Sequence, residues 1–289
     1  MKKIIATLIL LIFTILPSFA IKIGLLEQQP DFNIGSSKGA QIINEKTGKV
    51  LYSIQPMQMY TFKAYKGTIG LFVNGKPYNL GSTRIVVKPE MNGFLCAKQR
   101  WYRGVFIVQN INNELVLINN LPIEEYLLGV VPSEMPSGWS QEALKAQAIA
   151  ARSYAIANRG KHAKYGYDLK DTTEDQVYGG ATSEKPSTNK AVLDTESIVL
   201  TYDRKIIPAY YHASSGGQTK NSSEVWYKDL PFIKSVPSFD ANIAKNGHGI
   251  GMSQYGANNL AKEGYDAFQI LNHFYNDIHF GKIKPEWNL

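Results

Sequence analysis

The sequence predicts an α+β fold in which a β-rich N-terminal lobe precedes a mixed α/β core built around one Ala-rich buried helix. Apolar runs separated by turn dipeptides occupy residues 21 to about 125, which is the pattern of short strands. The segment from Ser140 to Asn158 is rich in Ala, the strongest helix former, and Ser140 suits its N-cap. The expected organisation is a targeting segment at 1–20, a β-rich region at 21–100, a core domain at 101–280 and a tail at 281–289.

The first twenty residues have the pattern of a secretory signal peptide. Lys2 and Lys3 form a basic start, residues 4–16 form an apolar run, and residues 17–20 supply small side chains at a cleavage-type site. The apolar run is short for a membrane span, and an uncleaved N-terminal anchor is the alternative. No Cys follows the run, so a lipid anchor on cysteine is not supported. We therefore expect an exported protein of the cell envelope or the extracellular space.

Charge and cysteine content exclude several classes of function. The 289-residue chain has a formal net charge of +7, and two of these charges come from Lys2 and Lys3. A positive balance favours anionic partners, but nucleic acid is not expected as the partner of an exported chain. Cys96 is the single cysteine, which excludes an intramolecular disulfide and a cysteine-based metal cluster. It is expected to be a small buried hydrophobe.

Short apolar runs and turn residues locate the remaining elements. Asn112-Asn113 is expected to close a hairpin that pairs residues 106–109 with residues 115–118. Further strands are expected at Ile21–Leu26, Gly70–Val73, Ile85–Lys88, Gly104–Val108, Ile198–Tyr202 and Ile206–His212, and turns at Asn74-Gly75, Asn92-Gly93 and Asp203–Lys205. Helices are expected at Ser187–Glu196, Met252–Lys262 and Ala267–Tyr275, and the tail is expected to be poorly ordered.

The stretch that leads into the Ala-rich helix is the most informative one. Glu134 lies between Pro132 and Pro136, whose restricted backbones predict a stiff loop presenting one carboxylate. Lys145 and Arg152 are seven residues apart in the helix, nearly two turns, so they share one face. This combination predicts a functional site that is held in place by a stiff loop and a buried helix. The alternative for a lone Glu in a loop is an ordinary solvated charge.

Two glycine-containing stretches downstream are further candidates. The run Ser214-Ser215-Gly216-Gly217 lets a ligand approach the backbone and can present N–H and O–H donors. It has neither nucleophile-elbow nor phosphate-loop spacing. His248 lies in a run that alternates Gly with side chains, which is typical of tightly packed backbone. From the residues alone, His248 is open to three roles: a catalytic group, a zinc ligand or a hydrogen-bonded structural histidine.

Three segments carry specific motifs in a fixed order. They comprise GVVPSEMP at 129–136 with EALKAQA at 142–148 and AARSY at 150–154, then AYYHASSGGQT at 209–219, then GHGIGMSQYGA at 247–257. In this order they closely resemble the SpoIID/LytB family of peptidoglycan-acting proteins. The resemblance covers roughly residues 21–275 and is strongest from Tyr102 onward.

The resemblance implies a chemistry for Glu134. The family includes lytic transglycosylases, which cleave glycan strands lacking stem peptides and use the Glu of the Ser-Glu-Met-Pro motif as the acid. Such an acid needs a raised pKa, so that it is protonated at work. Ordinary glycosidases need a second carboxylate. In a lytic transglycosylase the sugar's own 6-hydroxyl attacks and leaves a 1,6-anhydro-N-acetylmuramic acid end, so one marked Glu is enough. No metal or other cofactor is expected.

Other motif positions are implied to bind or polarise peptidoglycan glycan strands. Lys145 and Arg152 would suit the lactyl carboxylates of a stripped strand. Asp171, Thr172 and Gln176 are candidates for hydrogen bonds to sugar hydroxyls, with loop capping as the alternative for Asp171 and Thr172. The expected substrate-binding set is Lys145, Gln147, Arg152, Tyr154, Asp171, Thr172, Gln176, Tyr211, His212, Ser214, Ser215, Gly216, Gly217, His248, Met252, Ser253 and Gln254.

The chain departs from the family pattern at two places. Some spore-forming relatives bind zinc through Cys and His residues at positions that here hold Lys170, Glu174 and Asp175. Because thiolates are absent and Lys is no ligand at neutral pH, the metal is not carried over. Many relatives have a sizeable insertion before the Gly-His-Gly motif, and this chain has only residues 236–246 there. The contribution of that insertion is therefore in doubt for this chain.

Two alternatives to cleavage by Glu134 stay open. Other family members are described as modifiers that enhance a cell-wall amidase, so the chain is also a candidate for a non-catalytic partner of an N-acetylmuramoyl-L-alanine amidase. A zinc amidase that uses His212, His248 and a carboxylate is the third possibility, although the spacing is unlike His-Glu-x-x-His.

Overall fold

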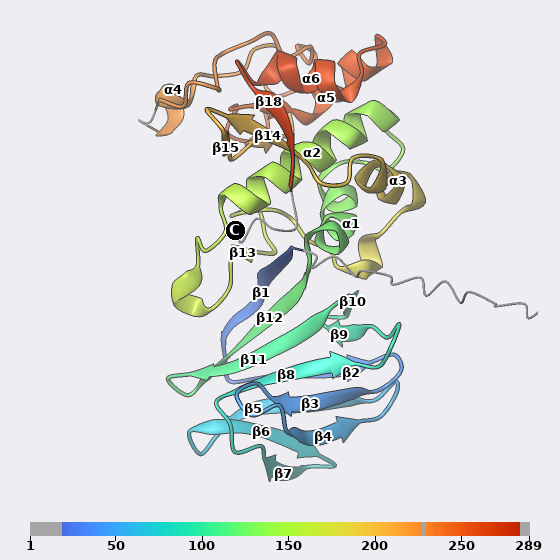
Figure 1. Cartoon of the computed structure of the whole chain (residues 1–289), viewed down its shortest axis with the longest axis vertical. Coiled ribbons are helices and arrows are strands. Elements are labelled where there is room, and N and C mark those ends of the chain that lie inside the picture. Colours follow the sequence, from blue (N-terminus) through green and yellow to red (C-terminus); the bar gives the residue numbers. More distant parts are fainter. Residues whose placement is uncertain (1–18, 227–228, 284–289) are drawn as a thin grey trace, which may run out of the picture.

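The computed structural model describes residues 19–226 and 229–283. Residues 1–18, which contain most of the expected signal peptide, lie outside the described residues, and so does the end of the expected tail at 284–289. Among the described helices, none is long and apolar enough to cross a membrane. The chain folds into a β-rich lobe and a helical core, which Figure 1 shows at opposite ends of the molecule. The predicted α+β class is confirmed.

Two sheets form the N-terminal lobe. Their inward side chains, such as Phe62 and Leu71 in one sheet and Phe106 and Leu117 in the other, are fully buried in a shared core. In order across the first sheet, the strands are β13 (Leu169–Lys170), β1 (Ala20–Gln29), β12 (Glu114–Pro122), β11 (Val105–Ile111), β8 (Arg84–Pro89), β3 (Ala40–Asn44) and β4 (Val50–Ile54). In the second they are β10 (Arg100–Tyr102), β9 (Leu95–Ala97), β2 (Asp31–Ser36), β5 (Met59–Tyr65), β6 (Thr68–Val73) and β7 (Lys76–Asn79).

The turn dipeptides have the structural role that the sequence predicts. Asn112 and Asn113 both adopt positive φ, at 52° and 68°, and join β11 to β12 so that Ile111 pairs with Glu114. Asn74 and Gly75 join β6 to β7 in the same way. Positive φ at both central residues matches the right-handed twist of the flanking strands, and Asn and Gly tolerate it best.

The core contains the described helices and two small sheets. The helices are α1 (Ile123–Glu134), α2 (Gln141–Ala157), α3 (Pro186–Asp194), α4 (Ser222–Trp226), α5 (Gln254–Lys262) and α6 (Ala267–Phe274), with single 3₁₀ turns η1 (Ala163–Tyr165) and η2 (Ala181–Ser183). One sheet has the order β15 (Lys205–Ile206), β14 (Ile198–Tyr202) and β18 (His279–Lys282), and the other pairs β16 (Tyr211–His212) with β17 (Met252–Ser253).

Helix α2 is the centre of the core, as the sequence predicts. Thirteen of its 17 residues are buried, and it packs against α1, α3, α5, α6 and β14. Its many Ala residues present little bulk, so that neighbours on several sides approach its backbone closely. Ser140 is the N-cap residue, but its hydroxyl makes no capping bond; its backbone N–H instead donates to Oδ1 of Asn258 at 3.0 Å.

A direct chain connection and a strand pairing are among the contacts that hold the lobe against the core. Strand β12 runs directly into α1, and the core strand β13 pairs in parallel with β1, with Ile23 opposite Leu169. The seven-stranded sheet therefore continues from the lobe to the base of the helices, as Figure 1 shows. This pairing fixes the start of the loop that follows β13, which is one wall of the candidate site.

Several local expectations need correction. The expected loop at Pro132 is the last turn of α1, because proline's fixed φ is compatible with a helix and only one backbone hydrogen bond is lost. Burial of Tyr126, Leu127 and Val130 offsets that loss.

The strand expected at 206–212 is split into β15 and β16. Helix α5 begins at Gln254 because Met252 and Ser253 belong to β17, and α6 ends at Phe274. Residues 279–282 form β18, so the chain is ordered past the expected start of the tail.

Candidate functional site

Glu134 lies at the C-terminal end of α1, where three segments meet. Its Oε1 accepts a 2.8 Å hydrogen bond from the backbone N–H of Val177, in the loop after β13. Its Oε2 lies 3.4 Å from the donating Nε2 of Gln254, the first residue of α5. The side chain is partly exposed. The carboxylate is therefore held in place from two directions while part of it still faces solvent.

Glycine at position 129 allows the loop after β13 to lie against α1. A Cβ at Gly129 would come within 2.5 Å of the Tyr178 ring and 2.9 Å of the carbonyl oxygen of Gly180. Glycine in a helix interior costs about 1 kcal/mol relative to Ala. Because Gly129 has no Cβ, the loop can approach α1 closely enough for the Val177 N–H to reach the Glu134 carboxylate.

Tyrosine and glutamine side chains support the loop behind Glu134. Gln176 is fully buried, and its Nε2 donates to the hydroxyl of Tyr211 at 2.8 Å and to the carbonyl of Ala151 in α2 at 3.2 Å. Its Oε1 accepts from the hydroxyl of Tyr126 in α1 at 3.3 Å. Because the amide is saturated by partners from three elements, it fixes the position of the neighbouring Val177.

The surroundings of Glu134 raise its pKa. Burial disfavours the charged carboxylate, and the hydrogen bonds from the Val177 amide, Gln254 and Tyr211 oppose this effect only in part. Burial also raises the pKa of Tyr126 and of Tyr211 well above the usual value, so both phenols stay neutral. The site thus combines a carboxyl group that holds its proton to higher pH with neutral hydroxyls around it.

Gln147 and Gln254 extend the site along α2. The Nε2 of Gln254 also lies 3.4 Å from Oε1 of Gln147, so it is shared between that amide and Glu134. The Nε2 of Gln147 is buried and has no hydrogen-bond partner within the described residues. Both residues belong to the expected set, and the structure brings them to Glu134.

Lys145 and Arg152 share one face of α2, but that face is turned toward α1 and α3. Arg152 is completely buried; its guanidinium forms a paired contact with Glu124 of α1, at 2.9 and 2.7 Å, and donates to the carbonyl of Ile198. Lys145 contacts Glu142 at 2.8 Å and Asp194 at 3.7 Å. Arg152 is therefore a structural cation, and neither residue joins the Glu134 cluster.

Three residues of the polar loop after β13 were expected at the site, and one of them lies in the Glu134 cluster. Gln176 belongs to the cluster, whereas Asp171 is buried and ion-paired to Lys98 of the lobe at 2.5 Å. Thr172 is exposed, and its hydroxyl accepts from the backbone of Glu174, which is the loop-capping alternative. Within the described ranges, no group of three or more His, Cys, Asp or Glu residues is arranged to hold a metal ion.

Tyr154 is positioned by a carboxylate that the sequence did not single out as part of the site. Its hydroxyl donates to Oδ1 of Asp175 at 3.3 Å, and Asp175 also accepts from Lys161 at 2.6 Å and contacts His162 at 2.8 Å. The Glu134 charge contributes to the raised pKa of Tyr154, whose main cause is burial. The phenol is thus fixed between α2 and the loop that carries Gln176.

Asp240 organises the Ser-Gly-Gly loop from within. It is completely buried and accepts from the backbone N–H groups of Ser215 and Gly217 at 2.7 and 2.8 Å, and from the hydroxyls of Ser238 and Ser253 at 2.5 and 2.6 Å. These donors point inward to a carboxylate, not outward to a ligand. Asp240 lies in the short 236–246 segment, where no motif marks it.

Ser214 of the same loop is buried, whereas Gly216 and Gly217 are partly exposed. The hydroxyl of Ser214 donates to the carbonyl of Ala244, and Gly216 and Gly217 adopt positive φ of 69° and 104°. Met252 is fully buried in the core.

His212 and His248 form a second cluster. Their rings lie 5.4 Å apart, and Trp226 packs 5.2 Å from His248. Nδ1 of His212 contacts the carbonyl of Ile250 and Nε2 contacts the hydroxyl of Ser215, while Nδ1 of His248 accepts from the Ile250 N–H. Burial and the neighbouring imidazole lower the pKa of His212 to about 4, and burial lowers that of His248.

Burial therefore disfavours the charged form of both imidazoles. The bond from the Ile250 N–H to His248 corresponds to the structural alternative given for that residue. Tyr211 and His212 are consecutive in β16, so their side chains point to opposite faces of the strand. Tyr211 belongs to the Glu134 cluster and His212 to the histidine cluster.

The fold and the site define a class: an α+β protein with one protonatable carboxyl group set among tyrosines and glutamines. Comparison with known proteins agrees with the motifs. Residues 111–202 match the family model described as SpoIID, Stage II sporulation protein. This match and the names of the relatives below support the resemblance to the SpoIID/LytB family that the motifs predict.

Relatives match parts of the chain. It is 49% identical to the amidase enhancer of Bacillus subtilis over 37% of this chain and 14% of that protein. It is 38% identical to Stage II sporulation protein D of Bacillus subtilis over 42% of this chain and 40% of the relative. It is 27% identical to Stage II sporulation protein D of Bacillus amyloliquefaciens over 56% of this chain and 74% of the relative. The chain thus spans less than half the length of two of these relatives.

Proposed function

We propose that this protein is a cell-wall lytic transglycosylase that cleaves peptide-stripped peptidoglycan strands with Glu134 as its single acid. The observation that carries the proposal is the environment of Glu134. Its carboxyl group has a raised pKa because of burial, yet it is partly exposed and held from two directions. A general acid needs a proton at working pH and a fixed position.

The proposed reaction uses one carboxyl group twice. Glu134 donates its proton to the glycosidic oxygen as the bond to the anomeric carbon breaks. The resulting carboxylate then accepts the proton of the sugar's own 6-hydroxyl as that oxygen attacks the anomeric carbon. The products are a free hydroxyl on one fragment and a 1,6-anhydro end on the other, and Glu134 is protonated again.

The neighbours of Glu134 suit this single-acid route. Within the described residues, the hydrogen-bond partners of the Glu134 carboxyl group are the Val177 amide and Gln254, and neither is a carboxylate. Asp175 is committed to Lys161, His162 and Tyr154. A hydrolase would need a second carboxylate at a defined separation, so the surroundings favour attack by the substrate's own hydroxyl.

Mass spectrometry of the products from peptide-free glycan strands tests the proposal. We expect anhydro-ended fragments with the unchanged protein and none with Glu134→Gln. Glu125→Gln is the matched control, because Glu125 lies in the same helix, is also partly buried and has a pKa raised mainly by burial. Reducing-end fragments would instead indicate hydrolysis and require a second carboxylate.

A non-catalytic role is the second candidate, favoured by the 49% identity to a protein named amidase enhancer. In that case the chain would bind peptidoglycan strands and increase the activity of an N-acetylmuramoyl-L-alanine amidase without cleaving glycan. Amidase release of stem peptides, measured with and without this protein, separates the two roles. Enhancement that persists in Glu134→Gln, with no anhydro products from either form, would favour this candidate over the first.

For both candidates we place the protein outside the cytoplasm, in the cell envelope or beyond it. The basic and apolar pattern at residues 1–20 supports export. Fractionation of cells that express the full chain would test this, and retention in the cytoplasm would contradict it.

A further inference from the structure

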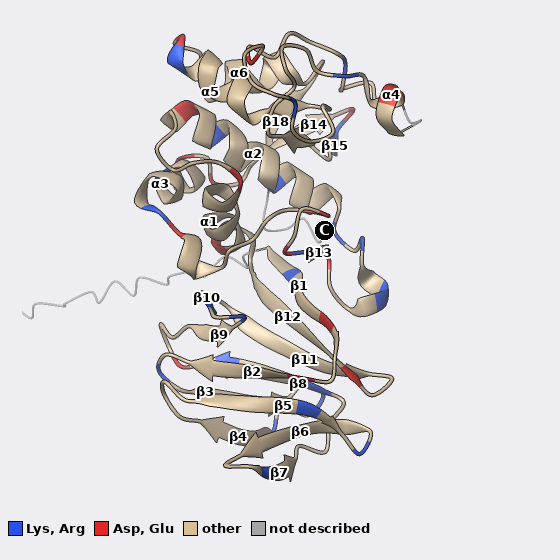
Figure 2. Cartoon of the chain, turned by 180° about the vertical axis from the view of Figure 1, so that it is seen from behind, with Lys and Arg blue, Asp and Glu red and all other residues tan. Residues whose placement is uncertain are grey.

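The positive charge of this chain resides in its β lobe. Residues 19–122 contain twelve Lys and Arg against five Asp and Glu, whereas residues 123–289 contain seventeen against nineteen. The lobe therefore carries a formal charge of +7 and the core −2. Figure 2 shows Lys and Arg distributed over the lobe strands. An anionic polymer is consequently attracted to the lobe more than to the part that carries Glu134.

The lobe also contains a pocket at the open edge of its two sheets. Strand β4 is the last strand of one sheet and β7 is the last strand of the other. The pocket between them has a volume of about 360 Å³ and is lined by Tyr52, Val73, Asn74, Lys76, Pro77 and Tyr78. In Figure 1 these strands lie at the end of the molecule opposite the helices.

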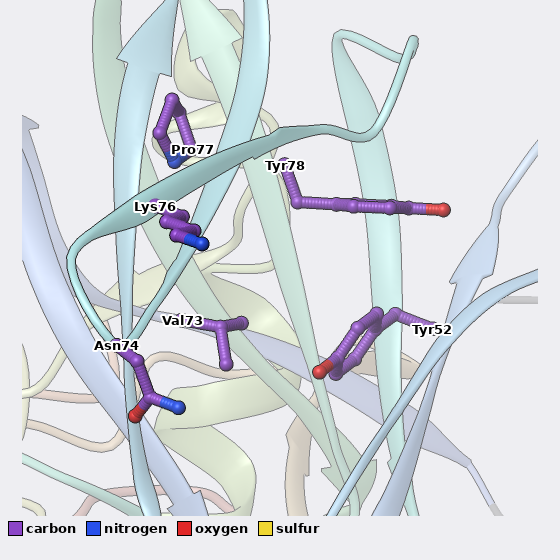
Figure 3. Close-up of a pocket in the computed structure, with 6 residues that line it drawn as sticks. All are labelled: Tyr52, Val73, Asn74, Lys76, Pro77 and Tyr78. Atoms are coloured by element: carbon purple, nitrogen blue, oxygen red, sulfur yellow. The ribbon is translucent and has the colours of Figure 1, made fainter.

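Two tyrosines provide the aromatic wall of this pocket. The rings of Tyr52 and Tyr78 lie 5.6 Å apart at an angle of 58°, and Tyr78 is 49% exposed. Figure 3 shows both rings on one side of the pocket, with Asn74 and Lys76 on the other side. Partly exposed aromatic faces next to polar groups suit a ligand with one apolar face and a hydroxylated rim.

A glycan ring has that combination of surfaces. Its C–H face packs on an aromatic ring, while its hydroxyl and acetamido groups hydrogen-bond to an amide such as Asn74. The lining residues include one cation, Lys76, and no carboxylate, so a sugar that carries a carboxylate is favoured over a neutral one. The excess charge of the lobe has the same sign and adds to this preference.

We propose that the pocket lined by Tyr52, Tyr78 and Lys76 is a second glycan-binding site, which holds an anionic sugar strand away from Glu134. This proposal rests on the proposed function for the identity of the glycan. A long strand bound at two places on one chain gains affinity from effective concentration. The lobe site would thus retain the polymer while the core acts on it.

Binding of peptide-free glycan strands to the full-length protein tests this site. All measurements use the Glu134→Gln background, so that the strands stay intact. We expect Tyr78→Ala to weaken binding about ten-fold, the ratio that corresponds to about 1.4 kcal/mol. Tyr78→Phe retains the ring and is expected to bind as tightly as the parent. Lys76→Gln is expected to weaken binding and to reduce its dependence on salt.

Matched variants outside the pocket show whether a loss of binding is specific to the pocket residues. Tyr265→Ala removes another tyrosine of similar exposure, in the core, and Lys49→Gln removes another lobe lysine. Tyr265→Ala is expected to bind like the parent, and Lys49→Gln is expected to weaken binding less than Lys76→Gln does. Thermal unfolding of each variant verifies that the fold is intact. Equal binding by Tyr78→Ala and Tyr265→Ala would overturn the proposal, and equal affinity for a neutral N-acetylglucosamine oligomer would overturn the preference for anionic sugars.

The binding test of the lobe site can succeed or fail whether or not the protein cleaves glycan. If the unchanged protein releases no anhydro products but Tyr78→Ala still lowers affinity, the proposed function fails and the lobe site stands. If cleavage occurs and Tyr78 has no effect on binding, the reverse holds.

Discussion

The backbone N–H of Val177 donates a 2.8 Å hydrogen bond to Oε1 of Glu134, across 43 positions of sequence. This bond favours the carboxylate form, whereas burial favours the carboxylic acid, and burial is the larger effect. The pKa of Glu134 is therefore raised, but by less than burial alone would raise it. An acid that must give up its proton and take it back in one cycle benefits from this balance.

Replacing Gln254 is expected to raise the pKa of Glu134 further. Gln254→Leu removes a donor that favours the carboxylate, so the protonated form persists to higher pH. If Glu134 is the acid, the alkaline limb of cleavage moves to higher pH in this variant, measured as anhydro products released against pH. An unchanged limb would mean that Glu134 does not set it.

Glu134→Gln is expected to stabilise the protein at neutral pH. The folded-state pKa of Glu134 is raised above the ordinary 4.5, so its contribution to stability is present below that value and is lost as pH rises through the folded-state pKa. A neutral amide avoids this loss, so the free energy of unfolding of the variant is expected to exceed that of the unchanged protein at pH 7. Urea denaturation at pH 7 and pH 4 would show the gain shrinking at the lower pH.

Removing Arg152 is expected to destabilise the fold. Arg152→Met leaves Glu124 without its buried partner and removes the donors to backbone carbonyls, so a loss of about 3–5 kcal/mol is expected. The double variant Arg152→Met with Glu124→Met removes both charges and is expected to regain much of that loss. Chemical denaturation of the two variants makes the comparison. Normal stability of the single variant, with impaired glycan binding, would indicate a substrate role for Arg152 instead.

Asp240 is expected to make the Ser-Gly-Gly loop sensitive to acid. Four hydrogen-bond donors hold the pKa of Asp240 below the ordinary 3.8 despite burial, so its contribution is present above that value and is lost as pH falls through the folded-state pKa. Asp240→Asn is expected to lower stability by about 2 kcal/mol at pH 7 and to flatten this acid loss. Thermal unfolding between pH 2 and 7 measures both effects. Asp203→Asn, at an exposed turn, is the control.

His212 is expected to produce a separate pH dependence in a higher range. Its pKa is lowered from 6.5 to about 4, chiefly by burial and then by His248, so the unfolded chain binds more protons between these values. Stability therefore decreases as pH falls from about 6.5 to 4, by roughly 2 kcal/mol after allowance for solvent screening. His212→Gln is expected to remove this decrease. Imidazole chemical shifts measured by NMR would contradict the assignment if His212 titrates near 6.5.

The local elements were predictable because short-range patterns encode them. The Ala content of α2 and the Asn112-Asn113 hairpin depend on residues within a few positions of one another, and both match the sequence. Pro132 was the exception, because its position in the last turn of a helix depends on what that helix packs against. Glu134 was also marked by its motif, as were the glutamines that the structure brings near it.

The partners of each charge were decided by tertiary structure. Sequence spacing correctly placed Lys145 and Arg152 on one face, but only the packing of α1 and α3 turned that face away from Glu134. Asp240 and the Tyr52–Tyr78 pocket carry no local signal, since Asp240 accepts from the N–H of Ser215, 25 positions away, and Tyr52 and Tyr78 come from different strands. The sequence by itself determined most of the local elements, the family resemblance and the single marked carboxyl group. Tertiary structure decided which polar groups are buried against one another, because desolvation and pairing depend on long-range contacts that no local pattern specifies.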